Sequence, residues 1–205
     1  MKQEISRDNI IQLAIFTAVC IWSVINPHDI ATWIMESLPA LIAVILLALT
    51  YKKFRFTGFL YWCILLHCII LFIGAHYTYA RVPLFDYLRD VFSMSRNNYD
   101  KLGHLAQGFF PALVVRELLL RTSPLKKGKW LFFIVTCICL AVSAFYEFIE
   151  WWAAVIIGGA ADDFLGTQGY VWDTQSDMFL AFAGAILAQL IFSRYQDKQI
   201  SGLNN

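Results

Sequence analysis

Six long apolar stretches, separated by short polar segments, dominate the pattern of the sequence. A helix needs about 20 mostly apolar residues to cross the hydrocarbon core of a bilayer, and the stretches are of that order. We therefore predict an all-α fold, a polytopic membrane helical bundle of about six transmembrane helices that forms a single transmembrane domain over residues 1–205. The predicted spans are residues 10–26, 33–50, 56–76, 102–120, 130–157 and 173–192.

The segment between the third and fourth spans, residues 77–100, has a pattern of its own. Apolar residues recur there at helical spacing, and charged residues occupy the opposite face. The apolar members are Leu84, Phe85, Leu88, Val91 and Phe92, and the charged members are Asp86, Arg89 and Asp90. This pattern is typical of a short helix that lies in the membrane interface or caps the bundle.

The composition supports a membrane protein and gives no sign of a nucleic-acid partner. Hydrophobic residues make up 59% of the chain and charged residues only 15%, whereas soluble domains carry about 25% charged residues. The 16 basic and 15 acidic residues leave a net charge of +1, so there is no overall basic field. The partner that the composition implies is the lipid bilayer.

The placement of lysine and arginine predicts the orientation, because cytoplasmic loops carry an excess of both. The two ends of the chain and the loops after the second and fourth spans share eleven basic residues. On the opposite side, all basic residues fall in one loop and are Arg81, Arg89, Arg96 and Lys101. We therefore expect a multi-pass protein of the bacterial inner membrane with both termini in the cytoplasm.

Ionisable residues inside the predicted spans are the candidates for function. Each costs about 2.5–3.5 kcal/mol at the centre of a spanning helix, so such residues are rarely accidental. With the predicted topology, eight acidic or imidazole groups fall in the outer leaflet, where we expect most to line one cavity open to the periplasm. They are Glu36, His76, Asp100, His104, Glu147, Glu150, Asp173 and Asp177, many at i, i+3 or i, i+4 spacing.

Six carboxylates in one cavity cannot all stay ionised without a cation, retained protons or an arginine partner. Carboxylates with an imidazole suit Zn²⁺, Mn²⁺ or Fe²⁺, and carboxylates alone suit Mg²⁺ or Ca²⁺. We assign possible metal ligation by a divalent ion to His104, Asp100, Asp173 and Asp177, and acid–base catalysis to Glu147 and Glu150. We expect His76, Glu36, Gln107 and Gln175 to surround these groups without ligating.

Some of these residues have simpler interpretations. Asp100 and Asp173 stand where an acidic residue is favoured at a helix N-terminus. His67, alone in the middle of a span, is expected to make an interhelical hydrogen bond. Arg116 and Glu117 are expected to serve the architecture of the cytoplasmic end of the bundle.

Several short motifs resemble the YjdF family of uncharacterised bacterial inner-membrane proteins, over essentially the whole chain. The resemblance implies an inner-membrane location and no established activity. Its motifs are residues 74–79 (GAHYTY), 96–104 (RNNYDKLGH), 145–152 (FYEFIEWW), 164–169 (FLGTQG) and 172–178 (WDTQSDM).

A partial similarity links the last three spans to VanZ-like membrane proteins. Asp100 with His104, and then Asp173 with Asp177, follow the order of that family's motifs, and small residues come next at 183–185. Glu150 departs from the pattern, which has glutamine there. The similarity implies a shared site in the outer leaflet and does not specify a reaction.

Three functions remain open from the sequence. The first is a metal-dependent intramembrane hydrolase or transferase that acts on a lipid-linked or envelope substrate. The second is a proton- or cation-coupled carrier of small solutes, which the absence of repeated halves disfavours. The third is a non-catalytic membrane assembly subunit.

Overall fold

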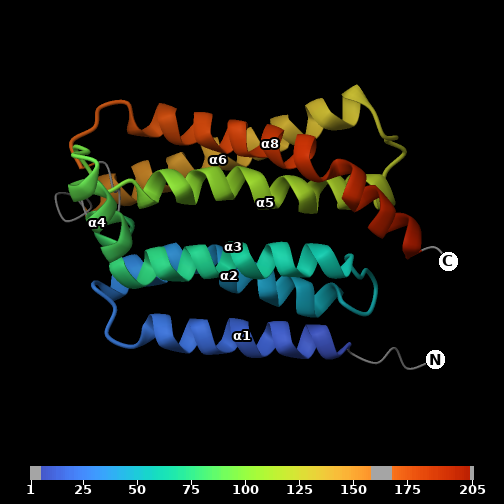
Figure 1. Ribbon diagram of the computed structural model, residues 1–205, viewed down its shortest axis with the longest axis horizontal. Coiled ribbons are helices and arrows are strands. Elements are labelled where there is room, and N and C mark those ends of the chain that lie inside the picture. Colours follow the sequence, from blue (N-terminus) through green and yellow to red (C-terminus); the bar gives the residue numbers. More distant parts are fainter. Residues whose placement is uncertain (1–5, 158–167, 204–205) are drawn as a thin grey trace.

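The computed structural model describes residues 6–157 and 168–203, and these contain helices but no strand. Each long helix runs antiparallel to the next one along the chain (Figure 1). The predicted all-α bundle is therefore confirmed. The long helices are α1 (Arg7–Val24), α2 (Ile30–Thr50), α3 (Gly58–Tyr77), α5 (Tyr99–Thr122), α6 (Lys129–Ile157) and α8 (Asp173–Gly202).

Every predicted span corresponds to a long helix, but α5 differs from the others. Five helices, α1, α2, α3, α6 and α8, are long and apolar enough to cross a membrane. Helix α5 is 24 residues long and carries charges at both ends, among them Asp100, Arg116 and Glu117. It packs against α3, α6 and α8, and these three side chains are buried. That α5 crosses the membrane therefore remains a prediction.

The helix limits differ from the predicted spans mainly at the C-terminal end. Helix α8 continues to Gly202, ten residues beyond the predicted end at residue 192. The sequence turns polar there, so the apolar pattern ends although the helix does not. Gln196 is nevertheless fully buried, and its side-chain amide donates to the Leu113 carbonyl at 2.7 Å.

Helices α1 and α2 begin at residues that cap their free N–H groups. Ser6 Oγ accepts a hydrogen bond from the Asn9 N–H at 3.1 Å, and Asp29 Oδ2 accepts one from the Thr32 N–H at 2.6 Å. Such caps satisfy donors that have no partner inside the helix. The hydrogen bond from Thr32 also holds the pKa of the Asp29 carboxyl below its usual range, since it stabilises the ionised form.

The closest helix pair is α5 with α8. A Cβ added to Gly108 would overlap the Ala181 carbonyl, and one added to Gly184 would overlap the Leu105 carbonyl. Small residues let the two backbones approach in this way, a common feature of helix packing in membranes. This contact fixes the start of α5 beside the start of α8, from which much of the candidate site is built.

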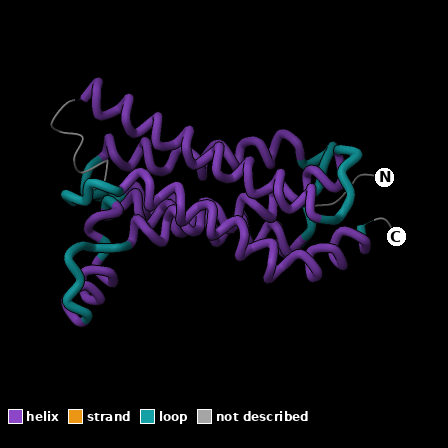
Figure 2. The backbone as a smooth tube through the Cα atoms, turned by 90° about the horizontal axis from the view of Figure 1, so that it is seen from above, coloured by secondary structure: helices purple, strands orange, loops and turns teal. Residues whose placement is uncertain are grey.

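We call the end of the bundle where α2, α5 and α8 begin the cluster end, and the opposite end the terminal end. Helix α1 begins and α8 ends at the terminal end, on the same side of the molecule (Figures 1 and 2). A buried network stands there around Glu117, which is fully buried. Its carboxylate accepts hydrogen bonds from the Thr57 N–H and hydroxyl at 2.9 and 2.8 Å, and from Arg121 at 2.8 Å.

The predicted interfacial helix is α4 (Pro83–Val91), which projects from the cluster end (Figure 2). Leu84 and Val91 on its apolar face are 62% and 54% exposed, so the protein itself does not cover them. Asp86 was expected on the polar face, but it is half-buried and accepts hydrogen bonds from Asn97 and Arg89. The reason is that α4 is attached to the bundle by its polar face. The Phe85 ring of α4 also packs edge to face against the Tyr99 ring.

Candidate functional site

The polar residues of three helices meet at one depth of the bundle. His104 lies five residues after the start of α5, Asp177 four after the start of α8, and Glu150 seven before the end of α6. At about 1.5 Å per residue, these positions are about 6–11 Å from the helix ends. The antiparallel arrangement therefore brings them to the same level at the cluster end.

His104 stands at the centre of this cluster, with carboxylates from three helices around its ring. Nε2 lies 3.3 Å from Asp100 Oδ1 and 3.9 Å from Asp177 Oδ2, and Nδ1 lies 3.9 Å from Glu147 Oε1. Only 6% of His104 is exposed, and Glu147 is buried to the same extent. The clustering of acidic and histidine residues predicted from the sequence is therefore present in the structure.

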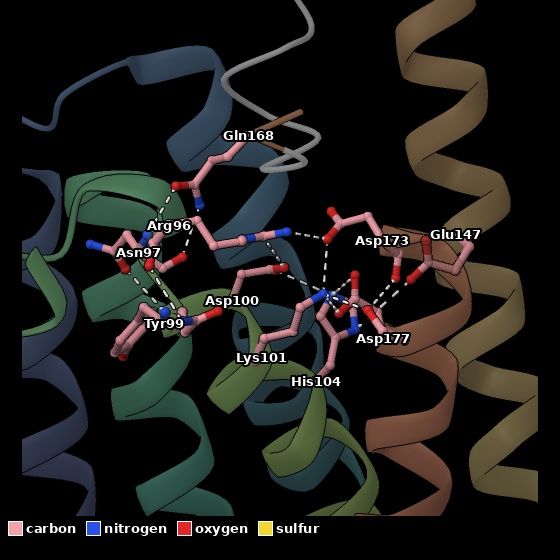
Figure 3. Close-up of polar contacts among 12 residues, drawn as sticks. Arg96, Asn97, Tyr99, Asp100, Lys101, His104, Glu147, Gln168, Asp173 and Asp177 are labelled. Atoms are coloured by element: carbon pink, nitrogen blue, oxygen red, sulfur yellow. Dashed lines mark hydrogen bonds and ion pairs between the residues drawn. The ribbon is translucent and has the colours of Figure 1, made fainter. Parts of the chain in front are cut away.

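Two basic residues, Arg96 in the loop before α5 and Lys101 in the first turn of α5, contact the acids of the cluster (Figure 3). The Arg96 guanidinium donates to Asp173 Oδ1 at 2.5 Å and to Asp100 Oδ2 at 3.4 Å. The Lys101 ammonium contacts Asp173 Oδ1 at 2.8 Å and Asp177 Oδ1 at 2.7 Å. Pairing with arginine was one of three predicted ways to compensate the acids, and it is realised for Asp173 and Asp100.

The loop that carries Arg96 is fixed by its neighbour Asn97, which is fully buried. The Asn97 amide donates to the Val82 carbonyl at 3.0 Å, and its side-chain oxygen accepts from the Tyr99 N–H at 3.0 Å. Gln168 forms two further hydrogen bonds with the Asn97 backbone, at 3.1 and 2.9 Å. These contacts join the loop before α5 to the segment before α8.

Among the described residues, two buried atoms that could ligate an ion have no hydrogen-bond partner in the cluster: His104 Nδ1 and Glu147 Oε1. They lie 3.9 Å apart and face each other. Buried polar atoms are nearly always satisfied, so such a pair calls for an explanation, for which an ion or water is a common one. The site thus has unused ligating capacity at its centre.

In the part of the chain that the structure describes, two groups of side chains are arranged so that each could hold a metal ion. In each group, one ligand atom per residue lies within 4.8 Å of the others, and both groups include His104. The first contains Asp100, His104 and Asp177, and the second contains His104, Glu147 and Glu150. Asp173, predicted as a ligand, belongs to neither group and contacts Arg96 and Lys101.

The structure places some of the residues predicted to surround the site beside it and others away from it. Glu36 accepts a hydrogen bond from the Tyr146 hydroxyl at 3.4 Å, and it lines the same cavity as His104 and Gln107. His76 lies apart from the cluster, with Nδ1 3.1 Å from the Ser23 carbonyl. Gln175 is exposed on α8.

His67 differs from its expected role. Its Nε2 is buried without a hydrogen-bond partner, and the ring stacks on Phe110 with centroids 5.6 Å apart. This nitrogen therefore does not make the expected interhelical hydrogen bond.

Tyr146 and Asn97 were not predicted from the sequence. Tyr146 lies four residues before Glu150, hence on the same helix face, but it stands in an aromatic run that resembles a lipid-facing surface. The signal for Asn97 was its place two residues before the first residue of α5, since an asparagine side chain often accepts a hydrogen bond from the backbone N–H two residues further on.

The comparisons with known proteins agree with this structure. A family model described as "Predicted membrane protein (DUF2238)" matches residues 9–198. The inner membrane protein YjdF of Escherichia coli (strain K12) is 48% identical over 184 residues, which cover 90% of this chain and 88% of that protein. No solved structure matches the chain. The chain belongs to the DUF2238 family and is a multi-pass protein of the inner membrane.

Proposed function

We propose that this member of the DUF2238 family is a metal-dependent hydrolase or transferase that acts on a lipid-linked or envelope substrate. The observation that carries the proposal is the pair of unpartnered, facing atoms His104 Nδ1 and Glu147 Oε1. His104 belongs to both possible ligand groups, and Glu147 belongs to the second. A divalent ion held by His104 Nε2, Asp100 and Asp177 would fix the ring proton on Nδ1, which then faces the Glu147 carboxylate.

The spacing of the ligand atoms supports this occupant. Bonds of about 2.1 Å in a tetrahedral site place neighbouring ligand atoms about 3.4 Å apart. His104 Nε2 lies 3.3 Å from Asp100 Oδ1 and 3.9 Å from Asp177 Oδ2, whereas Glu147 lies on the Nδ1 side of the ring. The ligand atoms of Asp100, His104 and Asp177 lie within 4.8 Å of one another, so small side-chain shifts would bring them to the spacing of such a site. One imidazole with several carboxylates is a donor set suited to Zn²⁺, Mn²⁺ or Fe²⁺.

The charge of the cluster supports the same conclusion. Arg96 and Lys101 are the permanent cations in contact with these acids among the described residues. Six carboxylates against two such cations leave four without a permanent counter-charge. A divalent ion would compensate two of them, and retained protons the others. The six are Glu36, Asp100, Glu147, Glu150, Asp173 and Asp177.

The proposed roles follow from the contacts. His104, Asp100 and Asp177 hold the ion, while Asp173 links Arg96 with Lys101 and so orients the lysine toward Asp177. When bound, the ion polarises a phosphoryl or carbonyl oxygen and stabilises the charge that develops on it.

Glu147 and Glu150 are the candidates for the general base that removes a proton from the attacking water or hydroxyl. Both reach His104 within the second ligand group, and Glu150 also lines the cavity described below. A base in this position lies beside the ion and in contact with the space open to substrate.

The orientation is part of the proposal. The basic residues that predict cytoplasmic loops belong to the terminal end, where Arg121 and Lys127 lie. The cluster end then faces the periplasm. A lipid-linked envelope precursor in the outer leaflet would present its polar part at this level.

The test is metal analysis of the detergent-purified protein after incubation with Zn²⁺, Mn²⁺ or Fe²⁺ and desalting. The proposal expects about one ion per chain in the wild type and a loss of at least fivefold in His104→Ala. His28→Ala is the matched control, since His28 lies in the loop before α2, and it should retain the ion. Equal metal content in His104→Ala and wild type, or none in either, would contradict the proposal and favour a proton-linked carrier.

A further inference from the structure

A cavity of about 560 Å³ extends from the candidate site into the bundle. Glu36, His104 and Glu150 line one end of it, and Thr50 and Phe54 line the other. It lies between α2 and α6, with residues of α3 and α5 forming its floor, and α2 and α6 lie behind α3 and α5 in the view of Figure 1.

The lining changes from polar to apolar along the cavity. Beyond Gln107 the lining side chains are aliphatic, aromatic or thiol, except for His67 and Thr50. The His67 ring is stacked on Phe110. The Thr50 hydroxyl donates to the Leu46 carbonyl of its own helix at 2.7 Å, so it presents no free donor. A cavity with such walls is not a stable place for water.

The dimensions suit a hydrocarbon chain. Glu36 and Thr50 line opposite ends and are 14 residues apart on α2, which corresponds to about 21 Å along a helix. Half of the hydrocarbon core of a bilayer is about 15 Å thick. The cavity therefore continues past the middle of the membrane when Glu36 lies near its outer boundary.

The side of the cavity opens toward lipid. Helix α2 packs extensively against α3 but makes no extensive contact with α6. Leu46 on α2 and Val142 on α6 line the cavity, and they are 54% and 50% exposed. Both lie well inside their helices, at a depth where the surroundings are hydrocarbon and not water.

We infer that this cavity binds one aliphatic chain of the lipid-linked substrate and so places the polar head at His104 and Glu150. The identity of the substrate rests on the proposed function, whereas binding of the chain does not. In a membrane, the chain gains little from the hydrophobic effect, because lipid tails are equally apolar. It gains the dispersion contacts that the walls of an empty cavity would lack, and holding the chain orients the head for reaction.

The test uses a photoreactive fatty alcohol that carries a diazirine near the end of its chain, with the protein in lipid nanodiscs. After illumination, peptide mapping should place the adducts on the cavity-lining parts of α2 and α5, near Ala43 and Val114. Ala43→Trp fills the cavity and should lower these adducts at least fivefold. Ala141→Trp is the matched control on an exposed face of α6, and it should leave them unchanged.

Unchanged labelling in Ala43→Trp, or equal labelling of the lipid-facing residues Ile45 and Phe133, would overturn the inference. If Ala43→Trp loses its thermal unfolding transition, Leu118→Trp at the lipid-facing edge of the cavity replaces it, with the same criteria. The inference and the proposed function fail separately. Labelling that persists in a metal-free His104→Ala supports the chain site alone, and a metal-binding protein with no cavity adducts supports the metal site alone.

Discussion

Glu117 illustrates at the level of one residue how a charge is held inside this bundle. It is fully buried, and its oxygens accept three hydrogen bonds from Thr57 and Arg121. Removal of one partner from a buried ion pair typically costs about 3–5 kcal/mol, because the other charge remains without compensation. The same requirement applies to the acids around His104, for which Arg96 and Lys101 supply only part of the counter-charge.

We predict that Glu117→Ala lowers the free energy of unfolding by about 3–5 kcal/mol, since Arg121 loses its carboxylate. Asp90→Ala is the control, because the Asp90 side chain is 70% exposed and surface changes usually stay within about 0.5 kcal/mol. Denaturant unfolding in detergent measures both. Equal stability of the two variants would show that the Glu117 network does not hold the terminal end together.

The sequence predicts single residues well when they interrupt an apolar run. His104, Glu147 and Glu150 stand out in this way, and the structure places them together. Asn97 and Tyr146 could not be predicted as easily, because asparagine is common in loops and tyrosine is common at membrane interfaces. Whether a side chain such as Asp173 ligates an ion or pairs with Arg96 depends on neighbours that are 77 residues away.

At the level of elements, hydropathy located the helices and packing determined the rest. The apolar runs predicted each long helix to within a few residues, except the end of α8, where the helix continues beyond the apolar run and buries Gln196. The attachment of α4 through Asp86 could not be predicted from its pattern, since an amphipathic helix can dock by either face. The partner that decides the face, Asn97, is not visible in the periodicity.

The contact between α5 and α8 gives a prediction at this level. Gly184→Val adds side-chain atoms against the backbone of Leu105 and Phe109, which cannot move as a flexible side chain would. We expect a loss of at least about 1–3 kcal/mol in stability, the usual cost of overpacking, and a loss of metal binding as the two ligand-bearing helices separate. Thermal unfolding and metal analysis check the two effects.

The control for this change is Gly202→Ala, at the end of the same helix, where an added Cβ meets no atom within 4 Å. It should be as stable as the wild type or slightly more stable, since alanine favours a helix by about 1 kcal/mol over glycine. A wild-type-like Gly184→Val would contradict the close approach of α5 and α8.

For the whole molecule, the basic residues and the helix arrangement predict that both termini are cytoplasmic. Green fluorescent protein fused after the last residue should fluoresce, as it does in the cytoplasm. Alkaline phosphatase fused after Ser93, in the loop between α4 and α5, should be active, because its disulfides form only in the periplasm. If both fusion proteins are produced in full length but neither is active, the cluster end lies in the cytoplasm and the argument for an envelope substrate is removed.

The central claim is that one ion is held at His104 by carboxylates from several helices. X-ray absorption spectroscopy of the Zn²⁺-loaded protein tests it most directly. The account predicts a first shell of one imidazole nitrogen and carboxylate or water oxygens at about 2.0–2.2 Å, with the imidazole signal absent in His104→Ala. A shell that contains sulfur, or one that is unchanged by His104→Ala, would contradict the account.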